Sequence, residues 1–352
     1  MFKKLLYFNR IPPYLIFFVT NRCNMRCQHC FFWQDINSGA AELTIEEIER
    51  VARSLPGLLF MRVTGGEPFM RGDIADIVGA FYRFSGLRRV GINTNGFFTE
   101  NIVENVKKML TQLNGIDLEI GISFDGLYEK HDTIRQCKGA FKNAVATFSA
   151  LKELKKTFPN LRLGFLATMM KDNQDEFEPL FNFLAGLEPD GIGLNLVRGA
   201  PKNDSELEID IEKFRSALTM INRFNQRKLS KHSLFDALRY AKTRLSQRII
   251  TETFINKRRY VKCNAADKIA VLYPDGAVSA CESSGYGLGN IRDYGHSFMK
   301  LWQSGAKKRV VEEIKRKKCF CTHECFITSS LVFAPFGLLK IAGKAIFNRR
   351  RP

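Results

Sequence analysis

The sequence predicts an α/β fold, a partial (β/α)6 TIM-like barrel followed by a small cysteine-rich C-terminal domain. Two observations indicate the barrel: short apolar runs alternate with amphipathic stretches between residues 15 and 197, and each run ends in polar or glycine residues. A third observation indicates the second domain, because a new group of cysteines begins at Cys263 after a charged, helical stretch without glycine.

Six apolar runs are the predicted barrel strands: 15–19, 58–63, 89–92, 118–122, 161–167 and 191–197. They are apolar nearly throughout, which is typical of parallel strands buried on both faces. Between them, Thr44 to Glu47 forms a capping box, Asp73 is expected to cap the next helix, and 141–158 has helical apolar spacing. The carboxyl ends of such strands meet at one mouth, and six units rather than eight leave a gap that we expect to admit a large substrate.

The chain divides into five predicted segments: a basic amphipathic N-terminal segment (1–14), the barrel (15–203), a helical bridge (204–260), the cysteine-rich domain (261–328) and a basic amphipathic tail (329–352). In the cysteine-rich domain, Cys263 and Cys281 flank an apolar run that a Pro-Asp-Gly turn interrupts at 274–276. A hairpin there would bring both cysteines to the same end. With Cys319, Cys321 and Cys325, five cysteines are available for the four ligands of a metal centre.

The formal net charge of +18 indicates a surface that attracts phosphates of nucleic acid or anionic lipid, although solubility alone is the simpler interpretation. The start of the chain lacks a clean secretion signal, and nine cysteines are an odd number, so we predict a cytoplasmic protein. Pro335, Lys340 and Lys344 interrupt the apolar end of the chain and favour an interfacial segment over a membrane span. We therefore expect peripheral attachment to the inner membrane face, unless both ends pack on the barrel instead.

Three cysteines, Cys23, Cys27 and Cys30, follow the first predicted strand at the spacing Cys-x3-Cys-x2-Cys. Three thiolates underfill a four-iron cluster and leave one iron open for a substrate or cosubstrate. The alternative is half of a structural zinc site, which would favour Cys-x2-Cys pairs.

This triplet resembles the signature of radical S-adenosylmethionine (radical SAM) enzymes. The resemblance continues in Thr64 to Pro68, similar to the GGEP motif of the family, in Asn93 to Gly96, similar to its TNG turn, and in Ser123 to Gly126, similar to its S-x-D-G strand end. It covers most of the first two hundred residues.

The resemblance implies a 4Fe-4S cluster on the three cysteines, with S-adenosylmethionine on the open iron. In that family, an electron from a donor such as flavodoxin or ferredoxin splits S-adenosylmethionine, and the 5′-deoxyadenosyl radical removes hydrogen from the substrate. The implied cofactor-binding residues are Gly65, Gly66, Glu67, Pro68, Asn93, Asn95, Ser123, Arg135, Asn195 and Arg198. The alternatives are an ordinary turn for the glycine loop, turn caps for the polar residues, and a surface ion pair of Arg135 with Asp132 or Glu129.

The cysteine-rich segment resembles a shortened SPASM domain, called twitch in its reduced version, which holds auxiliary clusters in many radical SAM enzymes. It implies one auxiliary 4Fe-4S cluster with ligands from Cys263, Cys281, Cys319, Cys321 and Cys325, whereas structural zinc is the alternative. Glu282 stands where sulfatase-maturing relatives carry a carboxylate, which predicts a general base, unless it is a solvated hairpin carboxylate.

The expected function is a radical SAM enzyme that abstracts hydrogen from a peptide or from a membrane-associated lipid or glycan precursor. The basic, amphipathic ends favour the lipid-linked substrate. The competing hypothesis is a zinc-bearing, non-enzymatic nucleic-acid-binding protein, but no stacking-rich module supports nucleic acid as a partner.

Overall fold

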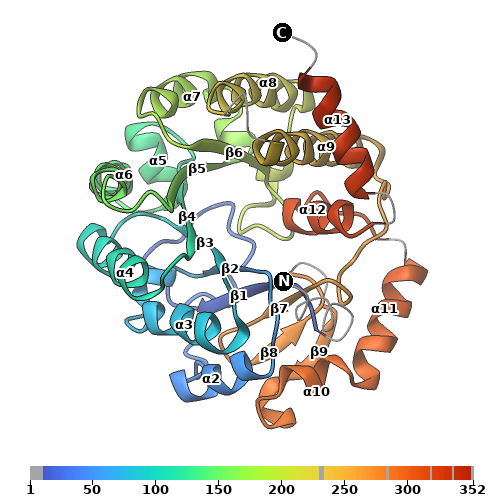
Figure 1. Cartoon of the computed structure of the whole chain (residues 1–352). Coiled ribbons are helices and arrows are strands. Elements are labelled where there is room, and N and C mark those ends of the chain that lie inside the picture. Colours follow the sequence, from blue (N-terminus) through green and yellow to red (C-terminus); the bar gives the residue numbers. More distant parts are fainter. Residues whose placement is uncertain (1–10, 230–233, 283–284, 318, 335–336, 350–352) are drawn as a thin grey trace.

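Six parallel strands form the wall of a partial barrel, and three further strands extend the same sheet (Figure 1). The structure, a computed structural model, describes residues 11–229, 234–282, 285–317, 319–334 and 337–349. The strands are β1 (Tyr14–Thr20), β2 (Phe60–Gly65), β3 (Arg89–Thr94), β4 (Asp117–Ser123), β5 (Leu161–Met169), β6 (Gly191–Leu196), β7 (Ile269–Leu272), β8 (Ala277–Ser279) and β9 (Gly287–Asn290), in the sheet order β6-β5-β4-β3-β2-β1-β7-β8-β9. The α/β partial-barrel prediction is confirmed.

Helices cover the outer face of the barrel strands. They are α2 (Ile45–Arg53), α3 (Ile74–Ala80), α4 (Thr99–Gln112), α5 (Tyr128–Arg135), α6 (Ala140–Lys155) and α7 (Phe177–Gly186). The predicted capping box of Thr44 and Glu47 is present at α2. Asp73 occupies the N-cap position of α3 but makes no capping bond, because its carboxylate is bound by Arg71. That part of the capping prediction is wrong.

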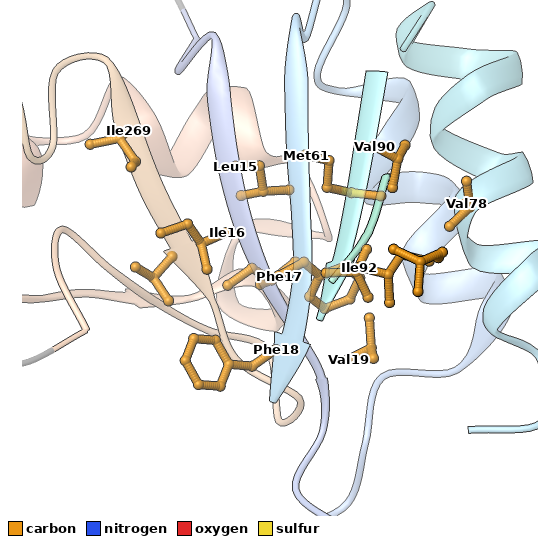
Figure 2. Close-up of a cluster of buried hydrophobic side chains, with 14 of the residues drawn as sticks. Leu15, Ile16, Phe17, Phe18, Val19, Met61, Val78, Val90, Ile92 and Ile269 are labelled. Atoms are coloured by element: carbon orange, nitrogen blue, oxygen red, sulfur yellow. The ribbon is translucent and has the colours of Figure 1, made fainter. Parts of the chain in front are cut away.

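The main core lies between the sheet and this helical layer. Every residue of β1 after Tyr14 is buried, and Figure 2 shows its side chains among those of β2, β3 and α3. Phe17 packs against Phe81 on the helical side, and Phe18 packs against Phe32 and Tyr273 on the other side. For β1, the predicted burial on both faces is confirmed.

In β2, β5 and β6, burial alternates along most of the strand, so the prediction of burial on both faces is wrong there. The partly exposed positions of β5 are Arg162, Gly164, Leu166 and Thr168, and all four line a cavity inside the barrel. The reason is that the interior of this barrel is hollow along these strands, whereas a filled barrel would bury both faces.

Four helices lie along the side of the barrel between β6 and β1, where the sequence predicted an open gap (Figure 1). They are α8 (Ile211–Arg227), α9 (Leu234–Asn256), α12 (Glu324–Val332) and α13 (Gly337–Arg349), and α9 contacts the other three. The expected open side is therefore covered by helices. Helix α12 also runs across the predicted segment boundary at 328/329.

Among the described residues, no single helix has the length and apolar composition to cross a membrane, and α12 and α13 meet those criteria only jointly, across a 98° bend. Residues 1–10 of the predicted N-terminal segment lie outside the described residues, as do residues 335–336 and 350–352 of the predicted tail.

The cysteine-rich segment continues the barrel sheet. The predicted hairpin is present as β7 and β8, but β7 also pairs in parallel with β1, with Tyr14 opposite Ile269. Helices α10 (Phe298–Trp302) and α11 (Gly305–Lys317) follow β9. Glu47 of α2 fastens this region to the barrel through Arg292, at 2.8 Å, and His296, at 2.9 Å.

Candidate functional site

A cavity of about 1490 Å³ runs through the barrel. Its wall contains residues from all six barrel strands, from the cysteine loop after β1, and from α9, α12 and α13. Cys23, Cys27 and Cys30 lie at the end where the strands have their carboxyl termini, as the barrel prediction requires.

The loop that carries the three cysteines is held from both sides. The Asn37 side chain accepts from the amide of Cys23 at 2.9 Å and donates to its carbonyl at 3.1 Å. On the other side, the amides of Arg26 and Gln28 donate to the carbonyls of Arg135 and Ile134 at the end of α5. These bonds fix the backbone between the thiols before any metal is bound.

The glycine loop after β2 lies directly against the backbone that leads to Cys23. The amide of Gly66 donates to the Thr20 carbonyl at 2.8 Å, and that of Glu67 donates to the Arg22 carbonyl at 2.8 Å. A Cβ atom on Gly66 would stand 2.7 Å from the carbonyl carbon of Arg22 and closer still to its oxygen. Only glycine fits this approach, and Gly65 and Gly66 both line the cavity.

Glu67 is buried, and its carboxylate accepts most of its hydrogen bonds from groups within the protein. It accepts from the amide of Phe69 at 3.2 Å, the hydroxyl of Thr94 at 2.7 Å and the amide of Asn95 at 2.7 Å. Burial raises its pKa above the ordinary value, and these donors oppose that rise. Glu67 therefore ties the glycine loop to the end of β3, and one acceptor position remains for a ligand.

Arg135 is buried beside the cysteine loop. Its Nη2 donates to Asp125 Oδ2 at 2.6 Å, so the alternative of a surface ion pair with Asp132 or Glu129 is wrong. Its Nε is buried without a hydrogen-bond partner. A donor left unsatisfied at the cavity wall fits an anionic group of a bound ligand.

The other predicted polar residues are divided between the cavity wall and the turns. Asn93, Ser123 and Asn195 line the cavity at the ends of β3, β4 and β6. Asn95 also lines it, but its side chain bonds Asn24 and the amide of Phe97, as a turn cap does. Pro68 is buried at the start of a short 3-10 helix, Pro68–Met70, and does not line the cavity.

Arg198, Glu282 and His323 form a group on the cavity wall, in which the side chains of Glu282 and His323 are buried and that of Arg198 is partly exposed. Glu282 contacts His323 Nε2 and lies 3.6 Å from Arg198, and its side chain is only 5% exposed, so the solvated-carboxylate alternative is wrong. Burial raises the pKa of Glu282, but the contacts with His323 and Arg198 outweigh this and leave it below the ordinary value. His323 was not among the predicted site residues, although its position between Cys321 and Cys325 was a usable signal.

The second group of cysteines surrounds a separate pocket of about 210 Å³. Cys263, Cys281, Cys319 and Cys321 line it, as does Arg259, whose Nη2 lies 3.3 Å from Cys319 Sγ. Cys325 lies elsewhere. It lines the large cavity and bonds Tyr14.

Both groups of thiols have the donor chemistry that an iron–sulfur cluster needs. Burial raises the pKa of Cys23 to about 11 and of Cys27 to about 12, so a bound metal would displace protons from them. No group of three or more His, Cys, Asp or Glu side chains in the described part of the chain is arranged to hold a metal ion. A four-iron cluster takes one thiolate on each iron, and each group of cysteines lines a cavity.

Comparisons with known proteins agree with this geometry. The family model of the radical SAM superfamily matches residues 17–184. Human molybdenum cofactor biosynthesis protein 1 is 38% identical over 141 residues, which are 38% of this chain and 21% of that protein. Fe-coproporphyrin III synthase of Methanosarcina barkeri is 30% identical over 178 residues, 49% of this chain and 41% of the relative. The chain thus spans less than half the length of these curated relatives.

Solved structures share the fold over nearly the whole chain. SuiB of Streptococcus suis, bound to its precursor peptide SuiA, matches with a TM-score of 0.60 and 14% identity, covering 94% of this chain and 71% of SuiB. The anSMEcpe structure with bound AdoMet and the Kp18Cys peptide matches with a TM-score of 0.58 and 14% identity, covering 96% of this chain and 99% of that one.

Proposed function

Because the chain belongs to the radical SAM superfamily, we propose that Cys23, Cys27 and Cys30 hold a 4Fe-4S cluster and that S-adenosylmethionine binds beside it. The observation that carries this proposal is the position of the three cysteines, on a fixed loop at one end of a large cavity, beside the unsatisfied Nε of the buried Arg135. The bound cluster and cosubstrate would supply a one-electron cleavage that generates the 5′-deoxyadenosyl radical, which abstracts hydrogen from a substrate.

The residues of the chain would bind and orient the cosubstrate. The close approach at Gly65 and Gly66 leaves backbone groups accessible to its amino group, together with the remaining acceptor position of Glu67. Arg135 would pair with its carboxylate. Asn93, Ser123 and Asn195 would bond its polar groups at the strand ends, and the enclosing wall would exclude water.

The second pocket would hold one auxiliary 4Fe-4S cluster. Its ligands would be Cys263, Cys281, Cys319 and Cys321, which line one pocket from three segments far apart in sequence. Four thiolates close the coordination of a four-iron cluster, so this cluster would leave no open iron. Glu282 follows Cys281 and lies on the wall of the large cavity, which keeps it the candidate for contact with the substrate.

The substrate would be a peptide or a membrane-associated lipid or glycan precursor. The similar proteins include a peptide-bound enzyme as well as enzymes named for small-molecule products, so resemblance alone does not choose between them. A soluble donor such as flavodoxin or ferredoxin would supply the electron. The enzyme would work in the cytoplasm, peripherally at the inner face of the membrane, where anionic head groups meet its basic surface.

Anaerobic reconstitution with iron and sulfide tests the proposal. We expect about eight irons per chain, from two four-iron clusters, and release of 5′-deoxyadenosine when dithionite and S-adenosylmethionine are added. The triple variant Cys23→Ser/Cys27→Ser/Cys30→Ser should lose the release and about half of the iron, while Cys137→Ser, which removes a cysteine outside both groups, should change neither. Zinc without iron, or no 5′-deoxyadenosine, would refute it.

A further inference from the structure

The interior of the barrel is kept open by glycines. In the middle of the wall, Gly121 of β4 pairs with Gly164 of β5, which in turn pairs with Gly191 of β6, and all three line the cavity. Gly193, on the same lumen-facing side of β6, lines it too. A glycine inside a strand adds no side chain and often marks the close approach of a ligand. Barrels usually fill this layer with branched side chains, so the glycines leave a passage.

The passage has length as well as width. The lumen-facing side of β5 runs from Arg162 to Thr168, six residue-to-residue steps, which is about 20 Å at the rise of a strand. At one end of the cavity stand the three cysteines of the radical SAM motif, and at the other stand residues at the amino ends of the strands, such as Pro13 and Leu59. An elongated ligand can therefore reach from the amino ends of the strands to the cysteine loop.

Cationic side chains line the passage at the end that lies farthest from the three cysteines. The cations that line the cavity there are Arg62, Arg89, Arg162, Arg239 and Lys242, and the acids that line it there are Glu119, Asp190 and Glu324. Asp117, behind the wall, binds Arg89 at 2.9 Å and Arg162 at 2.8 Å. Arg162 nevertheless has a buried Nε without a partner. Cations outnumber acids, so this end favours an anionic group such as a phosphate.

The surface opening of the cavity is edged by an apolar helix. Leu338 and Leu339 of α13 line the cavity and are 64% and 67% exposed, the highest values among the large apolar side chains of the described residues. The exposed Lys340 follows them, whereas Ile341 is buried against Ala241 of α9. Helix α13 lies beside α9 (Figure 1). Apolar side chains beside exposed lysine are typical of a helix that lies in an anionic membrane interface.

We propose that α13 seats this opening on an anionic membrane, and that the substrate is a lipid whose anionic head group enters the lumen while its chains stay at Leu338 and Leu339. The positive charge at the far end of the passage complements the anionic group of the lipid. The length of the passage lets the rest of the polar head group reach the cysteine loop. For the reaction, this inference rests on the proposed function. For the binding, it stands on the cavity, the charges and the exposed leucines.

Vesicle sedimentation tests the membrane contact. The full chain is mixed with vesicles of phosphatidylglycerol and phosphatidylcholine, or of phosphatidylcholine alone. We expect binding to the anionic vesicles, a loss of at least about tenfold in partitioning for Leu338→Glu/Leu339→Glu, and no change for Leu207→Glu, a control at an exposed leucine outside the cavity. Equal partitioning of the double variant and the wild type, or no binding at all, would overturn the inference.

Titration with dihexanoyl phosphatidylglycerol, kept monomeric, tests the lumen. Gly193→Leu places a side chain in the passage, where its Cβ would stand 3.1 Å from the movable Leu166 side chain. It should abolish binding of the short lipid and leave vesicle sedimentation intact. Unchanged lipid binding would overturn the lumen as the head-group site, as would binding only to a peptide.

Release of 5′-deoxyadenosine without substrate separates the two proposals. Leu207→Glu, at the exposed leucine outside the cavity, should keep the release. If the wild type releases 5′-deoxyadenosine but does not bind vesicles, this inference fails while the proposed cleavage of S-adenosylmethionine stands. If it binds vesicles but never releases 5′-deoxyadenosine, the proposed function fails.

Discussion

Replacement of Gly66 by alanine should destabilise the protein and disturb the cysteine loop. The added Cβ would stand 2.7 Å from the carbonyl carbon of Arg22 and 3.1 Å from that of Asn21, and distances under 3.0 Å require the backbone to move. Overpacking of this kind costs about 1–3 kcal/mol. The shift also strains the hydrogen bonds that the amides of Gly66 and Glu67 donate to β1 and its loop, worth about 1 kcal/mol each.

Together these effects amount to about 2–4 kcal/mol. For 352 residues, the usual unfolding entropy per residue converts this into a Tm lower by about 3–5 °C. Thermal unfolding of the metal-free chain measures the shift, and iron analysis after reconstitution measures the effect on the cluster, which should fall because Arg22 precedes Cys23. Gly72→Ala is the matched control, since its Cβ would meet nothing within 4 Å. A Gly66→Ala chain with the Tm and iron content of wild type would refute the reasoning.

Three further predictions concern a domain-bridging carboxylate, two cysteines and a buried ion pair. The pKa of Glu47 is lowered to about 2, chiefly by its hydrogen bond to Arg292 of the cysteine-rich region. The contribution of the Glu47 carboxylate to stability is therefore present above about pH 4.5 and is lost as the pH falls towards 2. Glu47→Gln should lower the Tm more at about pH 7 than at about pH 3, and an equal loss at both pH values would contradict this. Cys321→Ser should remove about four irons per chain and Cys325→Ser none, measured by iron analysis, and the reverse order would show that Cys325 is the ligand. Arg135→Gln should lower the free energy of unfolding, measured with denaturant, by about 3–5 kcal/mol, because it removes the cation that pairs with the buried Asp125. The double variant Arg135→Gln/Asp125→Asn should recover part of that free energy. No recovery would show that the loss of this ion pair is not the cause.

Local patterns in the sequence were sufficient to locate the strands, the cysteine triplet and the glycine loop. An apolar run of four to seven residues predicts a strand with at least one buried face, and the capping box of α2 involves residues only three positions apart. The carboxyl ends of parallel strands share one edge, so the sequence pattern alone was enough to place Asn93, Ser123 and Asn195 at one mouth.

Such local patterns could not predict which residues from distant segments contact one another. Asp132 and Glu129 are nearer to Arg135 in sequence than Asp125, but Asp125 is the residue that α5 brings within 2.6 Å. Likewise, Cys325 is only four residues from Cys321, yet the turn into α12 sends its thiol to the other cavity. Such choices depend on distances through space, which composition and spacing do not contain.

By itself, the sequence determined the class of fold and the candidate residues for the site, because hydrophobic periodicity and ligand spacing are local properties of the chain. Only the tertiary structure decided that the barrel is hollow along β4 to β6, that helices cover its open side, and that Leu338 and Leu339 edge the cavity. Each of these features arises where segments distant in sequence pack together, so each depends on the folded arrangement of the whole sheet and its helices.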